Sequence, residues 1–306
     1  MTVLFEPTLA THTTLECIDV SESIRFYREV MGLATLRRLK MAAVFRGTNG
    51  LIAASVQVPR PMPQPLLNFY TRPVQDRVQV EAVHAAVTAA GERYGIRQIT
   101  RLAEEDPARF GVGTYGFYLQ DRDGNWWRVE ENDGPFGKVE LPVDAEPRDA
   151  LVAAGPISYV TLECRDMHKT IRFYREFLGI DAEQQGPHYF FSRGNGGVCV
   201  IGVEVPEVMP QPVLNHHGIT LRGDPAMIDR LRDSVVRNAE EFGVMKVLPA
   251  TSQHGSYSFY MQDLDTNWWE IEILEELDPF QQTIKDGEWT EETAAAMGAR
   301  FSRHSV

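Results

Sequence analysis

The sequence lacks several features that would indicate particular classes of protein. It has no apolar run of about 18 residues, which argues against a membrane span. It has only three cysteines, none in CxxC spacing, as expected of a chain in the reducing cytoplasm. Its first residues show no basic start followed by an apolar core, so we expect no secretory signal. No cluster of Lys and Arg offsets the net charge of −13, so we expect neither nucleic acid nor a membrane as a partner.

What the sequence does contain is an internal repeat. Three blocks of the first half recur in the second half, and they begin at Thr13 and Val160, at Met62 and Met209, and at Gly113 and Gly255. The longest common segments are IRFYRE, MPQP and the pair of tryptophans after an Asp-rich turn. The chain is therefore two copies of one unit. We predict a first copy at 1–133, a linker at 134–156, a second copy at 157–275 and a helical tail at 276–306.

Each copy is itself double. A strand at 12–17 precedes a helix that Ser21 can cap and Gly32 can end, and three strand-like segments follow it. The same order of one strand, one helix and three strands then recurs, with the new strand at 66–71 and the new helix at 78–94. The sequence therefore predicts an α+β fold of four βαβββ modules.

The most informative stretch spans residues 254–272. It reads as a strand that ends near Tyr260, a turn rich in Asp and Asn, and a second strand of aromatic and β-branched residues. Glu270 lies in the middle of this apolar second strand. A buried carboxylate there needs a partner, because an unpaired one is very costly. The alternative is that Glu270 faces solvent on a half-exposed strand.

The segments FYREVMGL and FYREFLGI and the turns QDRDGNWW and QDLDTNWW resemble motifs of the vicinal oxygen chelate superfamily. That superfamily contains glyoxalase I, extradiol ring-cleaving dioxygenases and bleomycin-resistance proteins. The second copy also resembles the extradiol dioxygenase signature at His254, Tyr260 and Glu270, although Leu264 and Thr266 depart from it. The resemblance implies paired βαβββ modules, each pair forming an open barrel around a metal.

The resemblance also implies where metal ligands lie, namely on the first strands of two paired modules and on the last strand of one. Those positions hold His12 in the first module, His217 in the fourth, and Glu270 on the last strand. The remaining positions hold Tyr70, Tyr159 and Arg128, and a protonated Arg cannot bind a metal. Neither copy alone supplies two histidines and a carboxylate. We therefore predict that module 1 pairs with module 4 and module 2 with module 3, as the ring-cleaving hydroquinone dioxygenases imply.

The set His12, His217 and Glu270 is a facial triad that suits Fe(II), with Mn(II) as an alternative. His216 and His217 are neighbours on a strand, so only one of them can face a given metal, and the repeat alignment favours His217. Glu272 shares a face with Glu270 in an ideal strand and is a rival carboxylate. Its repeat counterpart Glu130 is present in the copy without a site, which suggests a general role for that position.

The activity implied is the oxygen-dependent cleavage of an aromatic diol, either a catechol or a hydroquinone. His254 would exchange protons with the substrate and Tyr260 would bind its metal-bound oxygen. His216, Thr14 and Tyr257 are candidate substrate contacts. Thr11 stands where hydroquinone dioxygenases usually have a histidine, so the choice between the two diols stays open.

Two other functions fit the sequence less well than this one. A glyoxalase-like isomerase or lyase tends to use a second carboxylate, and the segment LIAASVQV at 51–58 supplies none. A metal-free binding protein of the bleomycin-resistance type would have no need of the triad. We expect small molecules and O2 as the substrates, and a homo-oligomer as the assembly.

Overall fold

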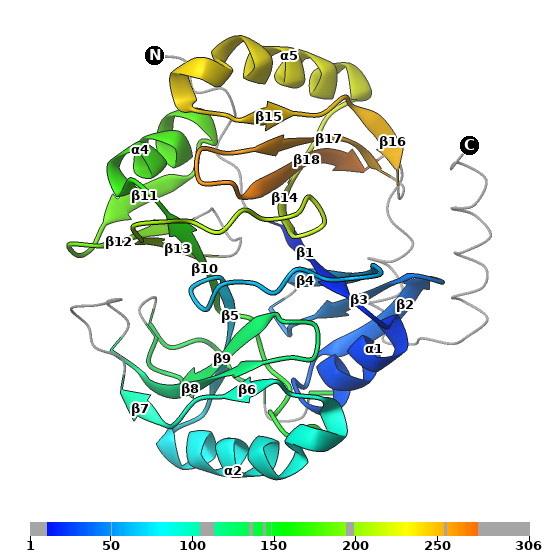
Figure 1. Cartoon of the computed structure of the whole chain (residues 1–306), viewed down its shortest axis with the longest axis vertical. Coiled ribbons are helices and arrows are strands. Elements are labelled where there is room, and N and C mark those ends of the chain that lie inside the picture. The colour runs from blue at the N-terminus through cyan, green and yellow to red at the C-terminus, as the bar shows by residue number, and fades with distance from the viewer. Residues whose placement is uncertain are drawn as a thin grey trace.

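In the part of the chain that the structure describes, two mixed β-sheets have four α-helices packed against them (Figure 1). The computed structural model describes residues 11–49, 51–104, 113–134, 137–142, 145–147, 149–193, 199–253 and 256–274. The tail predicted at 276–306 lies outside these residues. None of the helices in the described part of the chain is long and apolar enough to cross a membrane.

The elements follow the predicted modular order. Module 1 comprises β1 (His12–Cys17), α1 (Val20–Glu29), β2 (Ala34–Leu39), β3 (Ala42–Arg46) and β4 (Ile52–Gln57). Module 2 comprises β5 (Phe69–Val74), α2 (Arg77–Tyr94), β6 (Gln98–Ile99), β7 (Ala103–Glu104), β8 (Tyr115–Gln120) and β9 (Trp126–Glu131). Module 3 comprises β10 (Tyr159–Cys164), α4 (Met167–Arg172) with a π-helical continuation (Phe173–Phe177), β11 (Asp181–Gln184), β12 (Tyr189–Arg193) and β13 (Cys199–Glu204). Module 4 comprises β14 (His216–Leu221), α5 (Pro225–Phe242), β15 (Lys246–Val247), β16 (Thr251–Gln253), β17 (Ser256–Gln262) and β18 (Trp268–Leu274).

An aspartate precedes and caps each of the α-helices within the described residues. Asp19 caps α1 by accepting hydrogen bonds from the backbone amides of Ser21 and Glu22. The prediction that Ser21 itself caps this helix was therefore wrong by two residues. Asp caps are favourable because their carboxylates accept from amides that have no partner within the helix.

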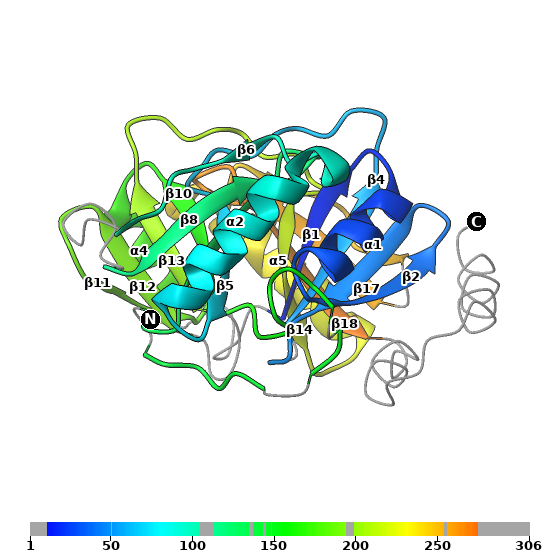
Figure 2. The same ribbon diagram turned by 90° about the horizontal axis from the view of Figure 1, so that it is seen from below.

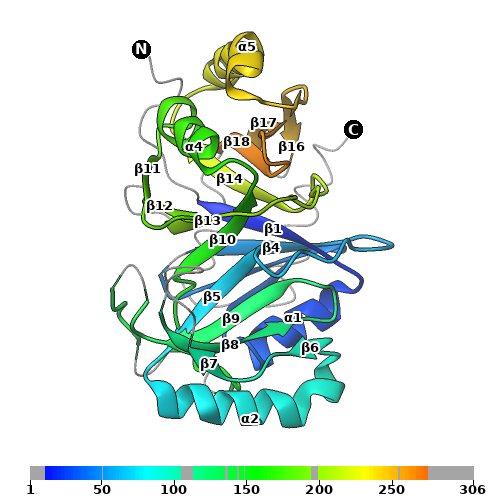
Figure 3. The ribbon, with the colours of Figure 1, turned by 60° about the vertical axis from the view of Figure 1, so that its left-hand side comes forward.

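The two sheets join the modules crosswise. Sheet 1, in the order β15-β17-β18-β14-β1-β4-β3-β2, joins module 4 to module 1 where β14 runs antiparallel to β1. Sheet 2, in the order β11-β12-β13-β10-β5-β9-β8-β6, joins module 3 to module 2 where β10 meets β5. Figure 3 shows these two junctions near the middle of the molecule. The predicted pairing of modules 1 with 4 and 2 with 3 is confirmed.

The helices connect the modules in the other direction, between neighbours in sequence. Helices α1 and α2 lie side by side (Figure 2), and the Tyr94 hydroxyl donates to Glu29 at 2.7 Å. Helices α4 and α5 are joined by Arg172, which donates to Glu241 at 2.6 Å. Each module thus contacts one partner through a sheet and another through a helix. One continuous cluster of buried apolar side chains runs through all four modules as a result.

Candidate metal centre

One row of residues crosses sheet 1 and brings the candidate ligands onto one face. Tyr260 lies opposite Glu270, Glu270 opposite Gly218, and Gly218 opposite His12. Residues that lie opposite one another on adjacent strands point to the same face of a sheet. His216, two residues before Gly218 on β14, points to this face as well. The row therefore combines modules 1 and 4, which lie at opposite ends of the sequence.

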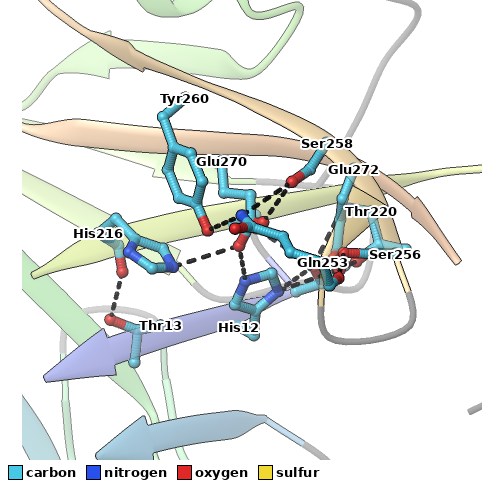
Figure 4. A network of polar contacts seen from close by, with 12 residues as sticks. His12, Thr13, His216, Thr220, Gln253, Ser256, Ser258, Tyr260, Glu270 and Glu272 are labelled. Carbon is cyan, nitrogen blue, oxygen red and sulfur yellow. Dashed lines mark hydrogen bonds and ion pairs between the residues drawn. The ribbon is translucent and has the colours of Figure 1, made fainter. Parts of the chain in front are cut away.

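Three side chains from this face converge (Figure 4). The Nε2 atom of His12 and the Nε2 atom of His216 each lie 3.2 Å from Oε2 of Glu270. One ligand atom from each residue lies within 4.8 Å of the other two, and the three residues form a group that could hold a metal ion. The other carboxylate oxygen of Glu270 accepts a hydrogen bond from Ser258 at 2.7 Å.

His216, rather than His217, belongs to this group, which corrects the residue chosen from the repeat alignment. His217 lies opposite Thr13 on β1 and opposite Trp269 on β18. Its ring packs 5.7 Å from the Trp269 ring, on the face of sheet 1 that carries the apolar core. Burial, followed by the nearby imidazoles of His216 and His12, lowers the pKa of His217 to about 3, so this residue stays neutral.

The error has a simple geometric cause. Strand β5 begins at Phe69 and strand β14 at His216, one residue before Tyr70 and His217, the residues assigned to the ligand positions. A slip of one residue along a strand moves a side chain to the opposite face of the sheet.

Gly218 makes room for the His12 ring. A Cβ atom on Gly218 would lie 1.9 Å from Cε1 and 2.2 Å from Nε2 of His12, far inside any normal contact. The absence of a side chain therefore lets the His12 ring lie across β14 and reach Glu270. Gly218 was not among the residues predicted from the sequence. The only sequence signal for its role is its position two residues after His216. That position shows that Gly218 lies against His12 only when the register between β14 and β1 is known.

The outer nitrogen of each histidine also has partners. Nδ1 of His216 lies 2.8 Å from the backbone oxygen of Val213, which can only accept, so the proton is assigned to Nδ1. Nδ1 of His12 lies 3.4 Å from the Thr11 hydroxyl and 3.5 Å from Oε1 of Glu272. Such contacts hold a histidine so that its other nitrogen presents a lone pair.

The charge of the group matches a cation. Burial by itself raises the pKa of the Glu270 carboxyl, but hydrogen bonds with His12 and His216 outweigh it and hold that pKa well below its usual value. Glu270 is therefore a carboxylate that attracts positive charge, either from a protonated histidine or from a divalent metal. Two imidazole nitrogens and one carboxylate are a known ligand set for Fe(II). The residues present thus fit a metal of this kind.

Two of the predicted active-site residues lie close to this group. The ring of Tyr260 is 5.0 Å from the ring of His216, and its hydroxyl accepts a hydrogen bond from Gln253 at 2.8 Å. Burial, followed by the charge of Glu270, raises the pKa of Tyr260 far above its usual value, so it remains a donor. Thr14 is buried and lies opposite His216 on the same face.

Tyr257 does not lie at the centre, which corrects its assignment as a substrate contact. It is an odd number of residues from Tyr260 on β17, so it points to the opposite face. Its hydroxyl donates to Asp229 of α5 at 2.8 Å. Ser258, which does reach Glu270, could have been found from its spacing of two residues from Tyr260. His254 lies outside the described residues.

Comparisons with known proteins agree with this architecture. The family model described as the Glyoxalase/Bleomycin resistance protein/Dioxygenase superfamily matches residues 10–129 and 157–271. A putative dioxygenase from Bacillus subtilis is 14% identical, with 99% of this chain and 98% of that chain covered and a TM-score of 0.60. Glyoxalase I from Zea mays is 15% identical, with 92% of this chain and 97% of that chain covered and a TM-score of 0.61. No curated protein matches the sequence. At such low identities the structural matches establish the fold alone.

Proposed function

Because the chain belongs to the glyoxalase/bleomycin resistance protein/dioxygenase superfamily, we propose that it is a metal-dependent dioxygenase that cleaves the ring of an aromatic diol. The substrate would be a catechol or a hydroquinone, and O2 the second substrate. The observation that carries this proposal is the convergence of His12, His216 and Glu270 on one point. Two histidines and one carboxylate leave three positions of an octahedral ion open, as enzymes that bind both a substrate and O2 require. Fe(II) is the proposed metal, and Mn(II) suits the same ligands.

The neighbouring strand supports three protein ligands rather than four. Three residues of β4 point to the face that carries His12, namely Ile52, Ala54 and Val56. This follows from the pairing of the strands, because Ile52 lies opposite His12 and Ala54 lies opposite Thr14. None of these residues is acidic. A glyoxalase-like isomerase or lyase would need a further carboxylate ligand from such a position. The three-ligand set therefore favours an oxygenase over that alternative.

The protein side chains have distinct tasks in this proposal. His12, His216 and Glu270 would hold the metal, which when bound brings diol and O2 together and carries electron density from the ring to O2. The Tyr260 hydroxyl would donate a hydrogen bond to an oxygen of the bound diol, and Gln253 holds that hydroxyl in place. Ser258 holds the second oxygen of Glu270. These groups orient the substrate before the reaction, which is the main contribution of such contacts to rate.

His254 remains our candidate for proton transfer. Its repeat counterpart in the first copy is Val112, so the histidine is specific to the copy that supplies most of the site. It follows Gln253 directly in the chain. An imidazole with an ordinary pKa near neutrality can remove a proton from the diol and return one later in the reaction.

The test compares two adjacent histidines. Protein purified without oxygen should hold about one iron or manganese per chain, and His216→Ala should lose most of it. His217→Ala is the matched control, because its ring lies on the opposite face, and it should keep its metal. Wild-type protein should then take up O2 when catechol or hydroquinone is added.

Two results would contradict the proposal. Loss of metal in His217→Ala with retention in His216→Ala would place the centre on the wrong face. A metal-loaded protein that takes up no O2 with either diol, yet converts a hemithioacetal, would point to the glyoxalase-like alternative.

A further inference from the structure

Glu272 lies just beyond the metal centre, on the same strand and face as Glu270. It lies opposite Thr220 on β14 and opposite Ser258 on β17. Its carboxylate is buried, and its Oε1 atom lies 3.5 Å from Nδ1 of His12. Nδ1 is the ring nitrogen of His12 that points away from the place where His12, His216 and Glu270 converge. Glu272 is therefore placed to act on His12 rather than on a metal.

A chain of hydrogen bonds also joins the two residues. The Thr220 hydroxyl lies 2.7 Å from Oε1 of Glu272, and the Thr11 hydroxyl lies 2.8 Å from the Thr220 hydroxyl. The Thr11 hydroxyl in turn lies 3.4 Å from Nδ1 of His12. Figure 4 shows His12, Thr220 and Glu272 grouped on one side of Glu270.

The direction of this chain follows from what each group can donate. A carboxylate only accepts, so the Thr220 hydroxyl donates its single proton to Glu272. The single hydroxyl proton of Thr11 is then directed to the Thr220 hydroxyl at 2.8 Å or to the backbone oxygen of Gly218 at 3.2 Å, and in either case it is not available to His12. Thr11 can therefore only accept from Nδ1 of His12, which must carry the proton. Nε2 of His12, 3.2 Å from Glu270, then either donates to that carboxylate when it is protonated or offers its lone pair to a metal.

Sheet 2 repeats this arrangement with other residues at the positions of the candidate metal ligands. Glu130 is the counterpart of Glu272, and Tyr159 is the counterpart of His12 in the repeat. The Tyr159 hydroxyl donates to Oε2 of Glu130 at 3.0 Å. In both sheets the glutamate thus contacts the residue that begins the first strand of the partner module. Glu130 accepts a hydrogen bond from Tyr159, and Glu272 lies beside His12.

We propose that Glu272, directly and through Thr220 and Thr11, is the positioning residue that fixes the tautomer and the ring orientation of His12 for metal binding. The proposal rests on the metal centre of the proposed function. His216 needs no such side chain, because a backbone oxygen fills the same role for it. The His12 side of the centre is therefore the side that a substitution of a neighbouring side chain can loosen.

The test measures metal affinity with a competing chelator, and uses graded variants. Glu272→Leu removes the acceptor and should weaken binding of Mn(II) by about 10- to 100-fold, the usual effect of losing such a partner. Glu272→Gln keeps an acceptor oxygen and should lose less. Thr220→Val breaks the chain and should also weaken binding, whereas Thr220→Ser keeps the hydroxyl and should bind as the wild type does.

Two further measurements separate positioning from general damage. Nitrogen NMR of the metal-free protein should show Nδ1 of His12 protonated in the wild type and partly unprotonated in Glu272→Leu. The unfolding temperature of the metal-free protein should change little between the two.

The possible results lead to different conclusions. Equal metal affinity and an unchanged tautomer in Glu272→Leu would overturn the proposal while leaving the metal centre intact. A loss of affinity that only follows a loss of stability, or that Thr220→Ser shares, would also overturn it. If wild-type protein binds no metal at all, the proposed function fails and this inference fails with it.

Discussion

Sheet 1 and sheet 2 share a strand arrangement but carry opposite charges at the same central position. Tyr260 lies opposite Glu270 in sheet 1, and Tyr118 lies opposite Arg128 in sheet 2. Nε of Arg128 lies 2.8 Å from Oε2 of Glu130, and both residues are only 1% exposed. A buried carboxylate needs a cation or hydrogen-bond donors. Glu130 in sheet 2 has the guanidinium of Arg128, whereas Glu270 in sheet 1 is contacted by His12, His216 and Ser258, and its two histidines could also bind a metal.

Aromatic and aliphatic side chains fill the face of sheet 2 that corresponds to the metal-centre face of sheet 1. Phe69 stands where His216 stands in sheet 1, and it belongs to a buried cluster that also contains Tyr118, Trp126, Tyr159 and Tyr189. Tyr70, which the alignment placed on this face, points to the other one and bonds to the hydroxyl of Thr13 at 2.7 Å. Sheet 2 is therefore built as a packed core at the place where sheet 1 carries its polar group.

The largest effect is expected from breaking the ion pair of sheet 2. Arg128→Met leaves Glu130 buried without its cation, and should lower the free energy of unfolding by about 3–5 kcal/mol. Urea unfolding of the metal-free protein measures this. The double variant Arg128→Met/Glu130→Leu removes both charges and should recover most of the loss.

The matching substitution in sheet 1 tests whether Glu270 is stabilised by its neighbours as strongly as Glu130 is by Arg128. Glu270→Gln in metal-free protein should cost far less stability, because the partners of Glu270 are His12, His216 and Ser258 rather than a guanidinium. A loss as large as that of Arg128→Met would mean that sheet 1 is stabilised by its own ion pairs and does not need a metal.

The next effect comes from filling the space that Gly218 leaves. Gly218→Ala places a Cβ against the His12 ring and should weaken metal binding by about 10- to 100-fold, as a clash of 1–3 kcal/mol implies. Its counterpart in sheet 2 is Thr71, which lies opposite Arg128 and already carries a Cβ. Thr71→Ala is thus the control and should leave metal affinity unchanged. Chelator competition measures both, and equal affinities for Gly218→Ala and wild type would refute the role of Gly218.

The module order was predictable from the internal repeat, and the crossed pairing from the repeat together with the ligand positions that the family resemblance implies. The repeat blocks locate the modules, and only a pairing of module 1 with module 4 brings two histidines to a glutamate. The structure confirms that pairing, and it brings His12 and Glu270 together. The binding of a metal by these residues stays a prediction.

The face of β14 was not predictable in the same way. His216 and His217 are both histidines, and a repeat alignment fixes position along a strand less sharply than the one residue that decides the face. The register between β1 and β14 decides it, because Thr14 lies opposite His216 and Thr13 opposite His217. The error over Tyr257 was avoidable, since strand alternation with Tyr260 already separates the two. The hydrogen bonds of Thr220 and Thr11 join residues that are far apart in the sequence. No local sequence pattern predicts such contacts.

The smallest effect concerns the histidine that faces the core. The pKa of His217 is lowered from about 6.5 to about 3 in the folded protein, so the unfolded chain binds this proton more readily. The contribution of this residue to stability therefore falls as the pH drops below about 6.5, and stops falling below about 3. Between pH 7 and pH 5 the loss should be about 2 kcal/mol.

Replacing His217 by its counterpart in sheet 2 measures how much His217 contributes to the pH dependence of stability. The counterpart of His217 is Tyr70, which carries no charge in this pH range, so His217→Tyr should remove that part of the acid sensitivity. Urea unfolding of metal-free wild type and variant at both pH values gives the difference, in which any constant cost of the larger ring cancels. The histidines of the metal centre are present in both proteins and cancel too. An identical pH dependence in the two proteins would show that His217 is already protonated, or already solvated, in the fold. In that case the two faces of β14 would differ less than their neighbours imply, and the assignment of His216 over His217 would depend on the metal measurement alone.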